Sequence, residues 1–314
     1  MAHAGVMTIR TETRRGALAM GAIGMACVGG SVAVSGVLAN APLFTAQAIR
    51  YAAASLLLLA LARAARVPIR LPRGAEWLWL SGVAATGLVL FNVAMVRGSE
   101  HAEPAALGVA VACVPVVLAL VGPLLEGGRP APGAVLAAVV VTAGAVLVQS
   151  GGRTDLAGLG WAATVLACEV GFTLLAVPVL RRHGPWGVSV HTCWIATAQL
   201  VVLAAVTEGP TAALALRIPH LLAIAYLAVV LTAIAFVLWY SAVGRLGTAL
   251  AGLLTGVAPV AAAVVGVLLG SPVPGTSVWA GTALVVAGLL LGVRPRPAQK
   301  PESVLTIRSG GSMG

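Results

Sequence analysis

The segment AALGVAVACVPVVLALVGPLL at residues 105–125 decides the fold, because the related segment ALAGLLTGVAPVAAAVVGVLL stands at residues 249–269. A shift of 144 residues aligns the two without gaps. An Ala-, Val- and Leu-rich composition yields some identities by chance, but matched prolines and glycines are harder to obtain. The identical pairs include Gly108/Gly252, Pro115/Pro259 and Gly122/Gly266, and the same shift places Gly144 on Gly288. The chain therefore contains an internal repeat.

Both segments are apolar, and so is most of the chain. Of the 314 residues, 60% are hydrophobic and 9% are charged, and the mean hydropathy is +1.02. Soluble domains carry about 25% charged residues, so this chain lacks the polar surface that a soluble protein needs. The composition predicts an integral membrane protein in which small residues let the helices pack closely.

A helix needs about 20 apolar residues to cross the hydrocarbon core of a bilayer, and this length divides the chain into about ten candidate spans. We therefore predict an all-α integral membrane fold. The predicted spans are 17–38, 43–62, 76–96, 104–125, 131–150, 156–179, 187–206, 218–240, 247–269 and 275–293.

Basic residues set the predicted orientation, because cytoplasmic loops are enriched in Lys and Arg. With a cytoplasmic N-terminus, 15 of the 19 Lys and Arg residues fall on the cytoplasmic side, and Arg50 lies inside the second span. We expect a multi-pass protein of the plasma (bacterial inner) membrane with both termini in the cytoplasm. The net charge of +10 comes from residues spread over these loops, which argues against a nucleic-acid partner.

The repeat predicts the domain organisation. Spans four and five recur as spans nine and ten, so each unit holds five spans. Because five is an odd number, the second unit must insert inverted, as in many secondary transporters. We expect a cytoplasmic N-terminal segment at 1–16, a first repeat at 17–150, a second, inverted repeat at 156–293 and a disordered cytoplasmic tail at 294–314.

These features make the chain resemble the EamA family of the drug/metabolite transporter superfamily. The apolar stretch with a central proline that ends in Leu-Leu-Glu or Leu-Leu-Gly is the characteristic part, and Arg50 in AIRYAAASLLLLA resembles an arginine of the family's second helix. Trp239-Tyr240-Ser241-Ala242, followed by Arg245, resembles the end of its eighth helix.

The resemblance spans residues 17–293 and implies an exporter of amino acids, metabolites or drugs, often driven by proton exchange. One departure from the family is visible. The family often closes both repeats with Glu, whereas here Glu126 has Gly270 opposite. A paired role for that glutamate is therefore open to one half only.

Ionisable side chains inside a span cost about 2.5–3.5 kcal/mol on the insertion scale and so mark candidate pathway residues. Glu169 is the only carboxylate predicted near the bilayer midplane. We favour a place in a proton or substrate pathway, and the alternative is a carboxyl tied to a neighbouring helix for packing. Arg50, which does not deprotonate in proteins, either snorkels outward or pairs with a carboxylate such as Glu169.

Four further residues complete the predicted pathway. His191 has a side chain that titrates near physiological pH, although a lone histidine is more often a hydrogen-bonded packing residue. Asn92 either lines a cavity or joins two helices. Pro115 and Pro259 each free a backbone carbonyl inside a span, which serves a hinge or a cavity wall or is a tolerated kink. Their matched positions favour the central cavity.

The sequence contains no phosphate-binding loop, no paired His/carboxylate metal motif and no nucleophile motif. We therefore expect no metal, no cofactor and no direct use of ATP. The expected partners are a small-molecule substrate, protons and the lipid bilayer, and the oligomeric state stays open. Our leading hypothesis is a secondary active transporter that exports small metabolites, amino acids or drugs by proton or substrate exchange. The alternatives are a membrane-embedded enzyme and a non-transporting membrane scaffold.

Overall fold

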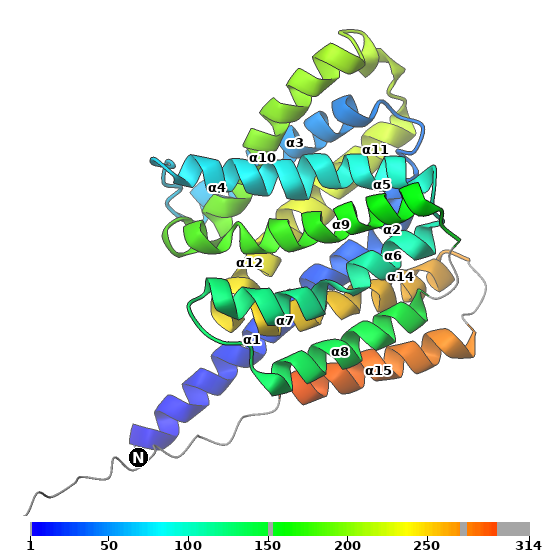
Figure 1. The fold of residues 1–314 in the computed structure, drawn as a ribbon. Helices are drawn as coiled ribbons and strands as arrows, with labels where there is room; N and C mark the ends of the chain where they lie inside the picture. Colours follow the sequence, from blue (N-terminus) through cyan, green and yellow to red (C-terminus); the bar gives the residue numbers. More distant parts are fainter. Residues whose placement is uncertain (1, 150–152, 271–274, 294–314) are drawn as a thin grey trace, which may run out of the picture.

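The fold is a bundle of helices in a computed structural model that describes residues 2–149, 153–270 and 275–293; the predicted tail 294–314 lies outside this part. Within these ranges no strand occurs, and the helices pack side by side with short connections at both ends of the bundle (Figure 1). Nine helices of the described part are long and apolar enough to cross a membrane, and the shorter apolar helix α8 (Pro132–Val148) completes the set of ten. The predicted all-α, multi-pass fold is confirmed.

The first half of the chain contains five spans, three of which are built from more than one helical segment. The elements are α1 (Ala2–Gly30), α2 (Val32–Gly36), α3 (Leu43–Ala64), α4 (Glu76–Val83), η1 (Ala84–Leu90), α5 (Phe91–Ser99), α6 (Pro104–Ala112), α7 (Val114–Leu125) and α8. Helix α1 begins at Ala2, so the segment that we separated from the first span is the start of the same helix.

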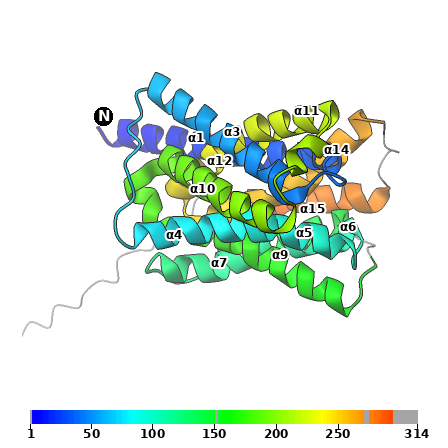
Figure 2. The same cartoon turned by 90° about the horizontal axis from the view of Figure 1, so that it is seen from above.

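The second half repeats this plan with five further spans. The elements are α9 (Leu156–Leu174), α10 (Val177–Thr207), η2 (Ala212–Ala215), α11 (Ile218–Tyr226), η3 (Leu227–Ile234), α12 (Ala235–Leu246), α13 (Thr248–Leu253), η4 (Leu254–Gly256), α14 (Val257–Leu268) and α15 (Thr276–Val293). Figure 2 shows α1, α3, α11 and α14 along one side of the bundle and α4, α5, α7 and α9 along the other.

The sixth and seventh spans meet at a single residue rather than at the loop that we predicted between 179 and 187. Gly184 has φ 64° and ψ 176° inside α10. This left-handed φ suits glycine because it has no Cβ to clash. Pro185 follows and starts the next helix, where its missing N–H costs nothing. The seventh span therefore begins directly at Pro185.

The two halves share the same local irregularities. The π-helical segment η1 interrupts the third span, and a shift of 144 residues carries it onto 228–234, inside the π-helical segment η3 of the eighth span. The fourth span breaks at Cys113, just before Pro115, and the ninth breaks at η4, just before Pro259. Matching interruptions at matching positions support a common ancestor for the two halves.

Helices α8 and α15 touch through their backbones at glycines of both helices, and two of these, Gly144 and Gly288, are related by the repeat. A Cβ at Gly144 would lie 2.7 Å from the backbone nitrogen of Val285, and a Cβ at Gly288 would lie 2.8 Å from the backbone nitrogen of Val141. The 144-residue shift exchanges these two contacts, as a two-fold relation between the repeats requires. The alignment made from sequence therefore describes the packing of these two helices.

The Gly144 contact predicts a stability effect. Gly144→Ala pushes a methyl group into the α15 backbone, and overpacking of this kind costs about 1–3 kcal/mol. We expect the midpoint of thermal unfolding, measured by tryptophan fluorescence on detergent-purified protein, to fall by several degrees. Gly160→Ala is the matched control, because a Cβ there meets nothing within 4 Å and alanine favours the helix. Equal midpoints for the two variants would contradict the close contact.

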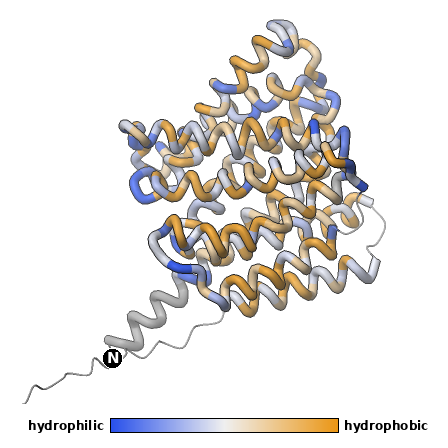
Figure 3. Tube along the Cα trace, viewed as in Figure 1, coloured by the Kyte–Doolittle hydropathy of each residue, from blue (hydrophilic) through white to orange (hydrophobic). Residues whose placement is uncertain are grey.

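The outer surface suits a lipid environment. Figure 3 shows hydrophobic residues along the lengths of the helices and hydrophilic residues gathered near the ends of the bundle. Large apolar side chains such as Leu56, Leu136 and Val202 are exposed on the helix sides. Such a surface is stable against hydrocarbon and would aggregate in water.

Two carboxylates join the repeats by capping helices of the opposite half. Glu208 at the end of α10 accepts hydrogen bonds from the backbone nitrogens of Phe44 and Thr45, both at 2.8 Å, at the start of α3. Glu126 at the end of α7 accepts one from the backbone nitrogen of Thr248 at 2.9 Å, at the start of α13. Each cap satisfies N–H groups that the helix leaves without partners and complements its dipole.

Candidate functional site

A cavity of about 460 Å³ lies among the spans of both repeats. Its wall is mainly apolar, and its polar members are few. Those polar side chains belong to Ser35, Gln47, Arg50, Tyr51, Asn92, Ser99, Glu169, Thr173 and Thr255, together with the indole of Trp239. A mostly apolar pocket with a few convergent polar groups is the usual form of a small-molecule site.

The cavity reaches one end of the bundle. Its wall includes Ser35, Leu38 and Leu43, where α2 leads into α3, and Ser99 at the end of α5. We call this end of the bundle the mouth end. At the other end of the third span lies Glu76, which is no part of the wall.

Arg50 is fixed in the wall by neutral partners. Its Nε donates to Thr232 Oγ1 at 3.0 Å, and its Nη1 donates to Gln47 Oε1 at 3.1 Å. The guanidinium carbon lies 4.8 Å from the centre of the Tyr51 ring, close enough for a cation–π attraction. Among the described residues no carboxylate oxygen lies within 4.0 Å of it, so the positive charge is positioned but not neutralised.

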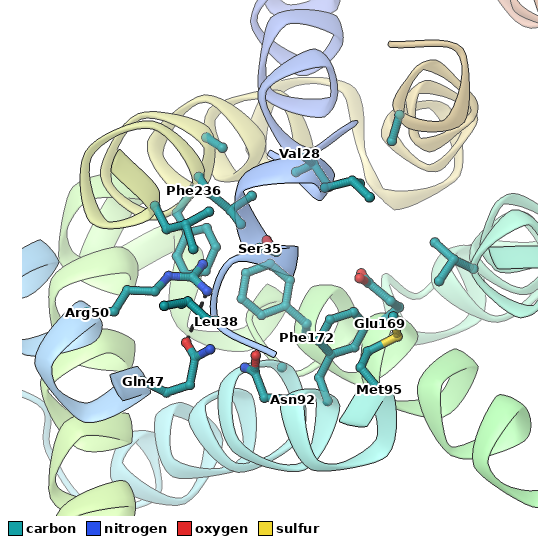
Figure 4. A pocket seen from close by; sticks show the side chains of 18 of the residues that line it. Val28, Ser35, Leu38, Gln47, Arg50, Asn92, Met95, Glu169, Phe172 and Phe236 are labelled. Carbon is teal, nitrogen blue, oxygen red and sulfur yellow. Dashed lines mark hydrogen bonds between the residues drawn. The ribbon is translucent and has the colours of Figure 1, made fainter. Parts of the chain in front are cut away.

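Glu169 faces the same cavity from α9. No hydrogen bond or ion pair joins its carboxylate to any residue within 2–149, 153–270 and 275–293. In Figure 4 Glu169 and Arg50 lie on opposite sides of the cavity, with Phe172 between them. The pairing of Arg50 with Glu169 that we considered from sequence is absent from this structure, because Arg50 is held by Thr232 and Gln47.

Asn92 also lies in the wall, as one of the two alternatives predicted. Its Nδ2 donates to the carbonyl oxygen of Leu88 at 2.6 Å and to the hydroxyl of Tyr51 at 3.1 Å. Leu88 belongs to η1, so the π-helical turn of the third span supplies the carbonyl. Asn92 thereby joins the third span to the Arg50 wall through Tyr51, and it serves both the cavity and the packing of two helices.

An aromatic cluster lies beneath these polar groups. The ring centre of Phe172 lies 4.9 Å from that of Phe236 and 5.2 Å from that of Tyr240. Tyr240 is fully buried and its hydroxyl donates to the carbonyl oxygen of Phe172 at 3.2 Å. Phe172, Phe236 and Trp239 line the cavity. We call Phe172, Phe236 and Tyr240 the aromatic floor.

The two matched prolines each follow, in sequence, a residue that lines the cavity. Pro115 and Pro259 are not lining residues, whereas their neighbours Val114 and Ala258 are. The helix interruptions before the prolines therefore shape the wall, while the rings themselves do not contact its interior.

His191 lies outside the cavity. Its Nε2 donates to the carbonyl oxygen of Arg70 at 2.8 Å, and its Nδ1 accepts from Trp194 Nε1 at 3.0 Å. One ring nitrogen donates and the other accepts, which is the pattern of a neutral histidine in a fixed tautomer. The structure therefore places it as a hydrogen-bonded packing residue, away from Glu169.

His191 belongs to a polar cluster around Glu76 at the end of the bundle opposite the mouth. The carboxylate of Glu76 accepts from Arg182 in an ion pair and from His183 Nε2 at 3.2 Å. It also accepts from the backbone nitrogen of Arg73 at 2.8 Å. The rings of His183 and His191 lie 5.3 Å apart. We call Glu76, Arg182, His183 and His191 the closing cluster.

Sequence reasoning missed the aromatic floor and the anchor of Arg50. A signal for Phe172 was present, because it lies three residues after Glu169 on the same helix face. Gln47, three residues before Arg50, shares a face with it for the same reason, and Tyr51 follows Arg50 directly in the chain. Thr232 has no such signal, since it reaches Arg50 only through tertiary packing.

A family model described as the EamA-like transporter family matches the chain twice, at residues 15–150 and 156–294. The chain belongs to the EamA-like transporter family. The matches cover both repeats, and the family is one of membrane transporters, in accord with the multi-pass helical fold. The cavity described above lies between the two matched segments, with wall residues from each.

Two curated relatives of this EamA-like transporter carry transporter names. A probable terminal-alkyne amino-acid exporter of Streptantibioticus cattleyicolor is 29% identical over 231 residues, which are 71% of this chain and 75% of that protein. The uncharacterized transporter YdeK of Bacillus subtilis is 28% identical over 174 residues, which are 54% of this chain and 60% of that protein. A solved crystal structure at 22% identity covers 88% of this chain and 96% of its own, with a TM-score of 0.74, and shows the same fold.

Proposed function

We propose that this EamA-like transporter is a secondary active exporter of small zwitterionic metabolites of the amino-acid type, driven by exchange for protons. The observation that carries the proposal is Glu169, a carboxylate without a partner among the described residues, facing an apolar cavity. An ionised carboxylate in such a place needs a counter-charge or a proton. The ammonium group of a bound substrate supplies the counter-charge, and when no substrate is bound a proton from the solution neutralises the carboxylate.

The opposite wall suits the other end of a zwitterion. Arg50 offers a fixed guanidinium, which binds carboxylates well because its planar donors match the two oxygens. A molecule with an ammonium group toward Glu169 and a carboxylate toward Arg50 neutralises both charges at once. The relative named a probable terminal-alkyne amino-acid exporter, 29% identical to this chain, supports this substrate class.

Proton exchange follows from the same two residues. When the substrate leaves, Glu169 loses its counter-charge and takes up a proton. The empty cavity therefore holds a neutral Glu169 while the transporter returns to the state that opens to the cytoplasm. Arg50 stays charged throughout. Each cycle thus couples the exit of one ammonium-bearing molecule to the entry of one proton, and a proton gradient directed inward drives export.

The distribution of basic residues supports an assignment of the mouth end to one side of the membrane. With both termini in the cytoplasm of a bacterial cell, the mouth end is external and the closing cluster is cytoplasmic. The structure then corresponds to an outward-facing state. Export requires a second state in which the closing cluster separates and the mouth end closes.

The proposal is tested by competition with halves of one probe. Purified protein is reconstituted into liposomes, and counterflow of radiolabelled norvaline is measured with norvaline, butylamine or pentanoate as competitor. A two-point site predicts that each half competes at least about tenfold more weakly than norvaline, the factor given by about 1.4 kcal/mol. Absence of counterflow, or butylamine competing as well as norvaline, would overturn the zwitterion site. Empty liposomes are the control.

A further inference from the structure

We infer that the ring of Phe172, backed by Gly87, sets how long an apolar side chain the transported molecule can carry. The inference rests on the proposed zwitterion site and adds the group that measures the rest of the molecule. Phe172 lines the cavity and lies between the Arg50 and Glu169 walls (Figure 4). A zwitterion that reaches both charges therefore passes over this ring, and its side chain takes the space that the ring leaves.

The ring has no room to move back toward the third span. A Cβ at Gly87 would overlap the Phe172 side chain, lying 2.7 Å from its Cγ and 2.8 Å from its Cβ. Glycine is thus the residue that lets η1 and α9 approach this closely. Because the contact includes Phe172 Cβ, a larger residue at position 87 displaces the whole side chain and not merely its tip.

Two other aromatic side chains hold Phe172 from below. Phe236 packs at 4.9 Å with an interplanar angle of 56°, and Tyr240 packs at 5.2 Å. The hydrogen bond from the Tyr240 hydroxyl to the Phe172 carbonyl oxygen fixes the backbone at the same point. With Gly87 on one side and the rings of Phe236 and Tyr240 on another, the open side of the Phe172 ring is the cavity.

A ring fixed in this position selects substrates by the length of their apolar side chain, and the size of the effect can be stated. Each methylene that a cavity accommodates strengthens binding about fourfold, and a methylene that meets the ring gains nothing or forces strain. Binding along a homologous series therefore rises with length and then falls once the side chain reaches Phe172. Moving the ring in either direction moves that maximum.

The test uses straight-chain α-amino acids as probes, from 2-aminobutyrate through norvaline and norleucine to 2-aminooctanoate. Binding to the full-length purified protein is followed by intrinsic tryptophan fluorescence, since Trp239 lines the cavity. Phe172→Ala is expected to move the maximum at least two methylenes toward longer chains. Gly87→Ala, which drives Phe172 toward the cavity, is expected to move it toward shorter ones.

Phe172→Leu is included in case the alanine variant fails to fold, and it should move the maximum in the same direction by a smaller step. Gly30→Ala is the control, because its Cβ would meet Val265 Cγ2 at an ordinary 3.5 Å and Gly30 is not a lining residue. The same maximum in all variants, or no binding of any probe by the wild type, overturns the inference. A shifted maximum without proton-driven flux would instead overturn the proposed function and leave the inference standing.

Discussion

Glu169→Gln is expected to abolish pH-driven net export while exchange of substrate across the membrane persists. Glutamine keeps the shape and hydrogen-bonding capacity of the side chain but neither binds nor releases a proton. The return step then no longer carries a proton, so an imposed pH gradient no longer drives net transport of the substrate. We expect net flux driven by the gradient to fall at least about tenfold, which corresponds to a loss of about 1.4 kcal/mol.

The measurement compares two fluxes in the same liposomes. Norvaline efflux under an imposed pH gradient reports coupling, and counterflow at equal pH reports binding and the conformational cycle. Glu100→Gln is the matched control, because Glu100 is an exposed carboxylate whose ion pair with Arg97 lies outside the cavity. Normal export by Glu169→Gln across a range of pH, together with complete loss in Arg50→Ala, would make Glu169 structural and move the site to the second span.

Glu76→Gln is expected to open the end of the bundle at which the closing cluster lies. The substitution removes the charge that holds Arg182 and His183, while the third span keeps its length and polarity. His191 still bonds Arg70, so the cluster loosens without losing every contact. We expect the population open at this end to rise about fivefold or more, at the low end of the range for coupled states.

The native Cys193 reports this opening. It is fully buried and lies two residues after His191 on α10. With Cys27, Cys113 and Cys168 replaced by Ala, a membrane-impermeant maleimide should label Cys193 faster in Glu76→Gln than in the parent when applied to inside-out vesicles. Glu100→Gln, at the mouth end, should leave the rate unchanged. Equal rates in all three proteins would show that the closing cluster does not hold this end shut.

The architecture was accessible from sequence because the bilayer imposes strong constraints. A span must be long and apolar, and a repeated Pro and Gly pattern reveals duplication even where most residues have diverged. The 144-residue shift found at Pro115/Pro259 also relates the backbone contacts of Gly144 and Gly288. Helix ends were less predictable: a single glycine, Gly184, separates two spans where a loop was expected.

The candidate site could be predicted only in part from the sequence, because only some of its residues differ in type from the apolar residues around them. Glu169 and Arg50 stand out in apolar runs because charge is costly there, and both line the cavity. Phe172 does not stand out by residue type, since an aromatic residue in a span is ordinary, and its only signal is its position three residues after Glu169. His191 stood out equally well but lies in the closing cluster. Its hydrogen bond to the Arg70 carbonyl depends on tertiary packing that no local pattern encodes, whereas Trp194 lies three residues along the same helix.

The seam between α8 and α15 restrains how the two halves of the gene can diverge. Gly144 admits the Val285 backbone and Gly288 admits the Val141 backbone, so a larger side chain on either copy forces the other helix away. A substitution at either position therefore affects the packing of both helices, although the two positions lie in separate repeats. At other positions the two copies already differ, as at Glu126 and Gly270. The two copies thus keep glycine at the matched positions where backbone meets backbone.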